Sequence, residues 1–190
     1  MSAQAGDGAG RHNEAAREDT EPEAGDLRVE SITLKKLKER FFDSVIETHS
    51  FRGDDTAVVK RVDIVEICRF LKEMPELSYN FLMDLTAVDY LGKKEPRFEV
   101  VYHFYSLKNK QRVRIKVPLP EADPTIDSVS SLWSVANWLE RECWDMFGIR
   151  FNGHPDLRRI LLYEEFQGHP LRKDYPVDKR QPLALPESHT

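Results

Sequence analysis

The feature that most constrains this sequence is the change of character within residues 140–176. The segment opens as an amphipathic helix, and Gly148 then fits a helix C-cap that needs positive φ. The helix charges crowd one side: Glu140, Arg141, Glu142 and Asp145. The polar tail that follows is interrupted by glycine and proline, so it predicts no long element. A helix that leads into such a tail predicts a surface that another chain covers.

Charge is distributed unevenly along the 190 residues, a length typical of one domain with extensions. Residues 1–30 hold eight acidic and three basic side chains, a net charge of −5. The whole chain also has a net charge of −5, so the remainder is neutral. Nucleic-acid binding usually needs a basic excess, which this chain lacks.

The first 26 residues are rich in Ala, Gly and Glu and nearly free of large apolar side chains. They cannot bury enough surface to offset the entropy of ordering, so we expect disorder there. They lack the apolar core of a secretory signal, and their acids are atypical of a mitochondrial transit peptide. No run approaches the ~18 apolar residues of a membrane span. We therefore expect an intracellular protein, soluble or peripheral to a membrane.

Cysteine and histidine usage argues against a metal centre within this chain. Cys68 and Cys143 are the only cysteines, and both fall in helical patterns, which favours two buried thiols. An ordinary iron–sulfur cluster takes about four cysteines. The six histidines show no HxxxH or HExxH spacing. We therefore expect no metal ligands.

Hydrophobic periodicity predicts the element order αββαβββα. The predicted helices cover 34–46, 63–74 and 131–147, and the predicted strands cover 47–51, 56–61, 80–90, 97–105 and 111–117. This order predicts an α+β domain over 27–148, in two layers, with helices on a largely antiparallel or mixed sheet. Residues 149–190 are then an extended C-terminal interaction arm.

Several details of these elements are testable. Asp63 and Glu66 have capping-box spacing at the start of the second helix. Residues 80–90 are apolar on both faces, as in a central strand, and 118–130 read as a loop. Residues 111–117 alternate, which directs Arg112, Arg114 and Lys116 outward, towards solvent or acids such as Glu99.

The third helix has a predicted apolar stripe formed by Leu132, Val135, Ala136, Leu139, Cys143 and Met146. Arg141 and Asp145 lie opposite this stripe, four residues apart, and we expect them to form a pair. Three tryptophans lie on or near the helix but outside the stripe. We assign Trp138 to the core, whereas Trp133 and Trp144 fit either the core or an interface.

Catalytic signals are weak. The only glycine cluster, at Gly6, Gly8 and Gly10, has the wrong spacing for a dinucleotide loop. Glu140 and Glu142 point about 200° apart on a helix and do not share a site, so we expect a charged edge that pairs with a neighbouring subunit. His169 precedes a proline, which favours an extended segment over a chemical role.

Three linked stretches, ERECWDMFGI, LRRIL and GHPLRKDYP, resemble the C subunit of respiratory complex I, the proton-pumping NADH–quinone oxidoreductase, in order and spacing. The resemblance implies a subunit without a cofactor in the peripheral arm, with FMN and iron–sulfur clusters in partner subunits. It also implies a contact with the D subunit, the I subunit nearby, and attachment to the cytoplasmic side of the bacterial membrane through the complex. The implied interface residues are Glu140, Arg141, Glu142, Asp145, Gly168, His169, Pro170, Leu171, Arg172, Lys173 and Asp174.

Two alternatives remain. The first is an equivalent subunit of a related machine: a membrane-bound hydrogenase, a reduced-deazaflavin dehydrogenase or a plastid-type dehydrogenase. The second is a stand-alone hydrolase that uses His169 with nearby acids, although no nucleophile motif supports it.

Overall fold

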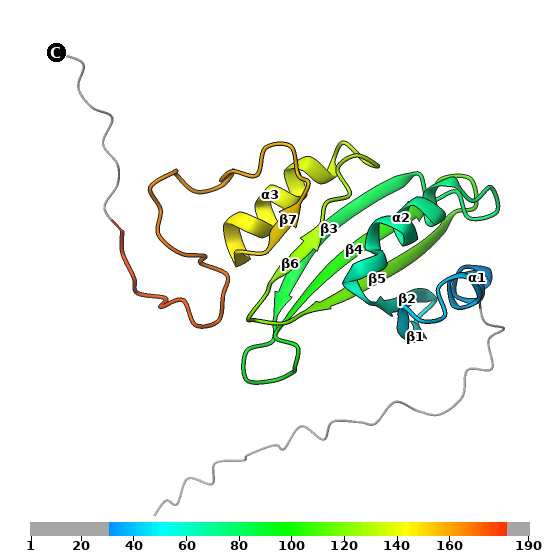
Figure 1. Cartoon of the computed structure of the whole chain (residues 1–190), viewed down its shortest axis with the longest axis horizontal. Coiled ribbons are helices and arrows are strands. Elements are labelled where there is room, and N and C mark those ends of the chain that lie inside the picture. The colour runs from blue at the N-terminus through cyan, green and yellow to red at the C-terminus, as the bar shows by residue number, and fades with distance from the viewer. Residues whose placement is uncertain (1–30, 182–190) are drawn as a thin grey trace, which may run out of the picture.

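A computed structural model describes residues 31–181 (Figure 1). The N-terminal tail predicted to be disordered lies outside the described residues. The elements are α1 (Ile32–Arg40), β1 (Val45–Phe51), β2 (Asp54–Val59), the 3-10 turn η1 (Arg61–Asp63), α2 (Ile64–Glu73), β3 (Phe81–Asp89), β4 (Phe98–Ser106), β5 (Gln111–Leu119), β6 (Thr125–Asp127), α3 (Ala136–Phe147) and β7 (Arg150–Asn152).

The main sheet has the strand order β1-β2-β5-β4-β3. All neighbouring strands are antiparallel except β2 and β5, which run parallel. The predicted α+β fold with a mixed sheet is confirmed. The prediction that residues 80–90 form a central strand is wrong, because β3 lies at an edge and leaves Phe81 and Met83 exposed.

One hydrophobic core joins the three helices to one face of the sheet. On β5 the predicted alternation is confirmed: Val113, Ile115 and Val117 are buried. On the opposite face Lys116 forms an ion pair with Glu99 at 3.0 Å, as expected for an outward basic row beside acids.

Helix ends differ from the predictions where tertiary contacts intervene. α1 begins after Ser31, whose hydroxyl accepts from Leu34 N, and it ends at Arg40, well before residue 46. The capping box at Asp63 is wrong: Asp63 makes no capping bond, and its carboxylate accepts from the Ser44 hydroxyl instead.

A small second sheet was not predicted. Strands β6 and β7 pair in parallel and bury Ile126 and Phe151. Each has three residues, too few to show periodicity. Ile149 is also fully buried, so the packed core continues past residue 148 into β7.

Residues 153–181, hereafter the C-terminal arm, contain no helix or strand. Figure 1 shows the arm (orange to orange-red) looping beside α3 (yellow). In this structure the arm bonds extensively to its own domain, while its predicted contact with another chain stays a prediction.

Candidate functional site

The arm caps the C-terminus of α3. The last carbonyl groups of a helix have no partner within the helix, so other groups must satisfy them. The Leu171 amide donates to Met146 O at 3.1 Å, and Arg172 Nε donates to Phe147 O at 2.6 Å. The His169 ring bonds to Asp145 O at 3.0 Å, and since a carbonyl only accepts, Nδ1 carries the proton. The GHPLR stretch is therefore part of its own domain, and Arg172 places a positive charge where the helix dipole is negative.

Gly148 makes this cap possible. It has φ +75°, as predicted for a helix C-cap. A Cβ atom at this position would lie 2.6 Å from the His169 ring and 2.7 Å from Arg172. Glycine thus serves both the left-handed turn and the close approach of the arm.

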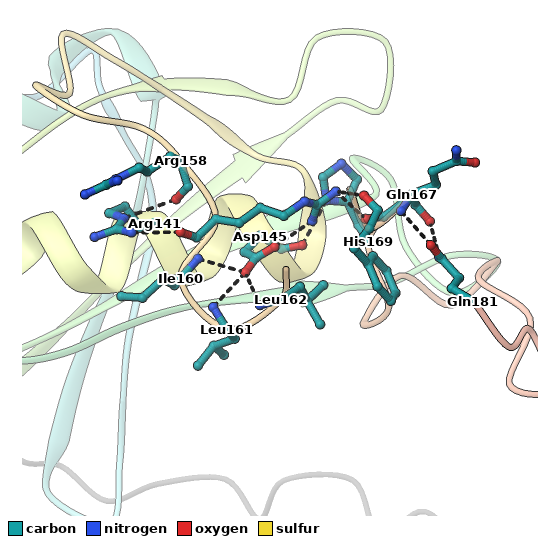
Figure 2. A network of polar contacts seen from close by, with 12 residues as sticks. Arg141, Asp145, Arg158, Ile160, Leu161, Leu162, Gln167, His169 and Gln181 are labelled. Carbon is teal, nitrogen blue, oxygen red and sulfur yellow. Dashed lines mark hydrogen bonds and ion pairs between the residues drawn. The ribbon is translucent and has the colours of Figure 1, made fainter. Parts of the chain in front are cut away.

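Asp145 is fully buried beneath the arm. Oδ1 accepts from Arg159 at 2.6 Å, and Oδ2 accepts from the amides of Ile160, Leu161 and Leu162 at 3.0, 2.9 and 3.0 Å (Figure 2). Burial by itself raises the pKa of Asp145, but these donors outweigh it and hold the pKa below its ordinary value. Asp145 is thus an ionised anchor for the arm.

The predicted pair between Arg141 and Asp145 is wrong. Arg141 donates to the carbonyl groups of Arg158 and Arg159, at 3.1 and 2.7 Å (Figure 2). Both predicted residues do lie opposite the apolar stripe, on the outer face of α3. The arm covers the part of this face that carries Arg141 and Asp145, and it provides hydrogen-bond partners for both side chains.

Arg159 was not predicted as a site residue, although it lies in the LRRIL stretch. Besides Asp145, it donates to Phe166 O at 2.6 Å and Gly168 O at 3.2 Å. Its guanidinium lies over the rings of Trp144 and Phe166, at 5.6 and 5.5 Å from their centroids. One arginine therefore joins α3 to two separate parts of the arm.

Glu140 is also fully buried, which corrects the prediction of a charged edge at this position. Its carboxylate accepts from the Ser128 hydroxyl at 2.6 Å and the Val129 amide at 2.7 Å. Burial raises the pKa of Glu140 to about 7 against these two donors. Its side chain is enclosed by its own chain, whereas the neighbouring Glu142 is exposed.

A second anchor holds the end of the arm. Arg97 is buried immediately before β4 and donates from Nε and Nη2 to both oxygens of Asp89, at 2.9 and 2.8 Å. It also forms ion pairs with Glu121 at 2.5 Å and Asp174 at 2.9 Å. The amide of Lys173 donates to Asp89 at 2.8 Å. The hydrogen bond from Arg97 is the main cause that lowers the pKa of Asp89 to about 2.

Nothing in the sequence pattern indicated this second anchor, because its members come from four separate segments. Asp174 had been predicted as an interface residue, and Lys173 likewise. The structure places both at the domain's own surface, with Asp174 half-exposed.

The environment of His169 does not support the hydrolase alternative. Burial lowers the pKa of His169, and its Nδ1 proton is used on the Asp145 carbonyl group. The Asp145 carboxylate faces Arg159 and three amides, so it does not serve His169 as a partner. His169 acts here as a helix cap.

The tryptophans divide differently from the prediction. Trp138 is 62% exposed, so its assignment to the core is wrong, while Trp133 is buried. Trp144 is half-buried between Arg159 and His169. The outer face of α3 therefore presents one tryptophan to solvent and packs another against the arm.

A metal ion or iron–sulfur cluster would need ligands from cysteine, histidine or carboxylate side chains. Both cysteines are buried, and burial raises the pKa of each thiol. Among residues 31–181, no group of three or more His, Cys, Asp or Glu side chains is placed to hold a metal ion. Within the same residues, no helix combines the length and apolarity needed to cross a membrane.

Comparison with known proteins gives concordant matches. Residues 57–181 match the family described as respiratory-chain NADH dehydrogenase, 30 Kd subunit. The C subunit of the NADH-quinone oxidoreductase of Geobacter metallireducens is 60% identical over 142 residues, covering 75% of this chain and 86% of the relative. A C subunit of the Rhizobium etli enzyme, the one numbered 2, is 49% identical over 158 residues, covering 81% of this chain and 83% of the relative.

The chain is also similar to solved structures, of which two are described. The trypsin-resistant fragment of Nqo5 is 36% identical with a TM-score of 0.57, and the match covers 66% of this chain and all of the fragment. A chain of the membrane-bound sulfane sulfur reductase, an archaeal respiratory membrane complex, is 23% identical with a TM-score of 0.64, covering 76% of this chain and 84% of that chain. The second match shows a shared fold.

Proposed function

This chain belongs to the family of the 30 kDa subunit of respiratory-chain NADH dehydrogenase, and from that membership we propose that it is a structural subunit of an NADH-quinone oxidoreductase. The observation that carries the proposal is the 60% identity over 142 residues to a relative named as the C subunit of that enzyme. In this function the chain holds no redox cofactor. Electrons pass from NADH through FMN and iron–sulfur clusters in partner subunits to quinone.

The side chains support a structural function. The conspicuous charged residues are engaged in holding the arm: Asp145 with Arg159, and Asp89 with Arg97. With two cysteines, both buried, the chain is two short of the four that an ordinary iron–sulfur cluster takes. The chain thus offers a rigid surface for other subunits, which we propose to be the D subunit and the iron–sulfur I subunit. We place it on the cytoplasmic side of the membrane, attached through the complex.

The test is a gene deletion in the source bacterium with complementation by a tagged copy. We expect membranes without the chain to lose NADH-driven quinone reduction, and the tagged chain to co-purify with NADH-binding and iron–sulfur subunits in mild detergent. The isolated chain should be colourless and inactive with NADH.

Two results would contradict the proposal. Stoichiometric iron or flavin in the purified chain would show that it carries a cofactor. Co-purification with hydrogenase or deazaflavin-dehydrogenase subunits would assign it to a related machine instead.

A further inference from the structure

Three apolar side chains, hereafter the knob surface, are exposed here: Val135 just before α3, Trp138 on the outer face of α3, and Leu161 in the arm. Their exposed fractions are 42%, 62% and 61%. The exposure of Val135 corrects its predicted place in the apolar stripe. Trp138 and Asp145 share one helix face at a spacing of seven residues, about 10 Å along the axis. Since the Leu161 amide is bonded to Asp145, the backbone of Leu161 is attached to α3 about two helical turns from Trp138.

The polar network around Asp145 and Arg141 holds the backbone of Leu161 and the guanidinium that lies over Trp138. Leu161 lies in the middle of the three amides that donate to Asp145, and Figure 2 shows its side chain directed away from that carboxylate. The Arg141 guanidinium lies over the Trp138 ring at 5.7 Å and is fixed by two arm carbonyl groups. A segment whose backbone is ordered before binding loses less entropy on binding, which favours affinity.

One positive charge beside the knob surface has no acidic partner among residues 31–181. Asp145 compensates Arg159, and Asp156 compensates Arg158 at 2.9 Å. Arg141, by contrast, donates to carbonyl groups and forms no ion pair with a carboxylate within residues 31–181. A positive charge next to an exposed tryptophan is the pattern of an interface hot spot, where Trp and Arg are enriched.

We infer that the knob surface docks into an apolar depression on another subunit of the same oxidoreductase, with a carboxylate of that subunit facing Arg141. The inference rests on the proposed function, because it needs a partner subunit. It assigns indirect roles to two predicted interface residues: Asp145 presents Leu161, and Arg141 presents Trp138. The contact is then made mainly by side chains that the sequence motifs did not single out.

Leu107 provides a matched control for Leu161. It is also 61% exposed, but it lies in the turn between β4 and β5, away from the arm. We expect Leu161→Asp to lower the amount of assembled complex in membranes about tenfold, as for a hot-spot residue, and Leu107→Asp to change it less than about twofold. Leu161→Ala should lower it about threefold, and Trp138→Ser about tenfold.

Misfolding must be separated from lost docking. Each isolated variant is therefore compared with the wild-type chain by thermal unfolding, where we expect no change for Leu161→Ala and Leu107→Asp. If Leu161→Asp unfolds the chain, the Leu161→Ala comparison decides, and assembly at the wild-type level by that variant would overturn the inference.

A photo-crosslinking amino acid at residue 161 identifies the occupant directly in the purified complex. We expect a crosslink to a different subunit of the oxidoreductase from residue 161 and not from residue 107. A crosslink to a second copy of this chain, to its own terminal segments, or to nothing would overturn the inference. Failure of the proposed function would give a different result: the wild-type chain itself would be absent from the oxidoreductase.

Discussion

At the residue scale, the buried carboxylates differ in their hydrogen-bond donors, and these donors determine whether each carboxylate is ionised. Glu140 accepts two hydrogen bonds from neutral groups, and burial raises its pKa to about 7. Asp89 meets the Arg97 guanidinium and two backbone amides, and its pKa falls to about 2. One buried acid therefore titrates near neutral pH, and the other stays ionised.

The first prediction concerns Glu140. Its pKa is higher in the folded chain than the ordinary 4.5, so the folded state holds the proton more tightly and stability falls as pH rises from 4.5 through about 7. Glutamine does not ionise, and its amide can donate to Ser128 while its oxygen accepts from Val129. We expect Glu140→Gln to equal the wild-type chain at pH 5 and to exceed its free energy of unfolding at pH 8 by on the order of 2 kcal/mol.

Urea unfolding across pH 5–8 measures this difference. Glu142→Gln is the control, because that side chain is exposed and the substitution should leave the pH profile unchanged. His154 Nε2 lies 4.0 Å from the Glu140 carboxylate, so the profile should be repeated with His154→Gln. If the free energy of unfolding changed with pH in the same way for Glu140→Gln and the wild-type chain, the raised pKa would not belong to Glu140.

The second prediction concerns Asp89. Asp89→Asn leaves the Arg97 guanidinium buried without its fully buried partner, and we expect a loss of about 3–5 kcal/mol in the free energy of unfolding. Glu121→Gln is the control: its carboxylate is 56% exposed, so its loss should cost about 0–1 kcal/mol. The pKa of Asp89 is lowered, so its contribution is complete above pH 3.8 and is lost as pH falls towards 2. Equal urea midpoints for the two variants would contradict this account.

At the scale of elements, periodicity predicted the sheet and helices because most strands and helices are long enough to show it. On α3 it also gave the correct outer face, with Arg141 and Asp145 opposite the stripe. It did not predict that the arm covers part of this face, because the arm itself has no periodicity. The second anchor was missed for a related reason: Asp89, Arg97 and Asp174 are brought together by topology alone.

The third prediction concerns the junction of α3 and the arm. In Gly148→Ala, the alanine would have to adopt a positive φ, and its Cβ atom would lie 2.6–2.7 Å from His169 and Arg172. Gly92→Ala is the matched control, because Gly92 has φ +71° but no atom within 4 Å of the added Cβ. We expect about 1 kcal/mol of destabilisation at Gly92 and on the order of 3 kcal/mol at Gly148. Thermal unfolding of the two variants gives the comparison, and equal melting temperatures would show that the arm yields to the extra carbon.

At the scale of the whole molecule, the chain is built as sheet, helix layer and arm. The sheet and helices share one core, whereas polar anchors hold the arm at the end of α3 and at Arg97. The arm satisfies helix carbonyl groups that would otherwise be unpaired, so it packs on its own domain in the single chain. We therefore expect other subunits to meet a surface that is already formed.

The last prediction tests that order of events by hydrogen exchange in the isolated chain. The amides of residues 160–162 donate to a buried carboxylate, and those of Leu171 and Lys173 donate to Met146 O and Asp89. The Gln167 amide instead donates to the half-buried side chain of Gln181, in a hydrogen bond at the surface. Exchange requires these bonds to open, so the first five amides should exchange on the order of 100-fold more slowly than Gln167. Fast exchange of all six in the isolated chain, with protection only in the assembled enzyme, would mean that the arm orders on binding and would overturn the preformed surface.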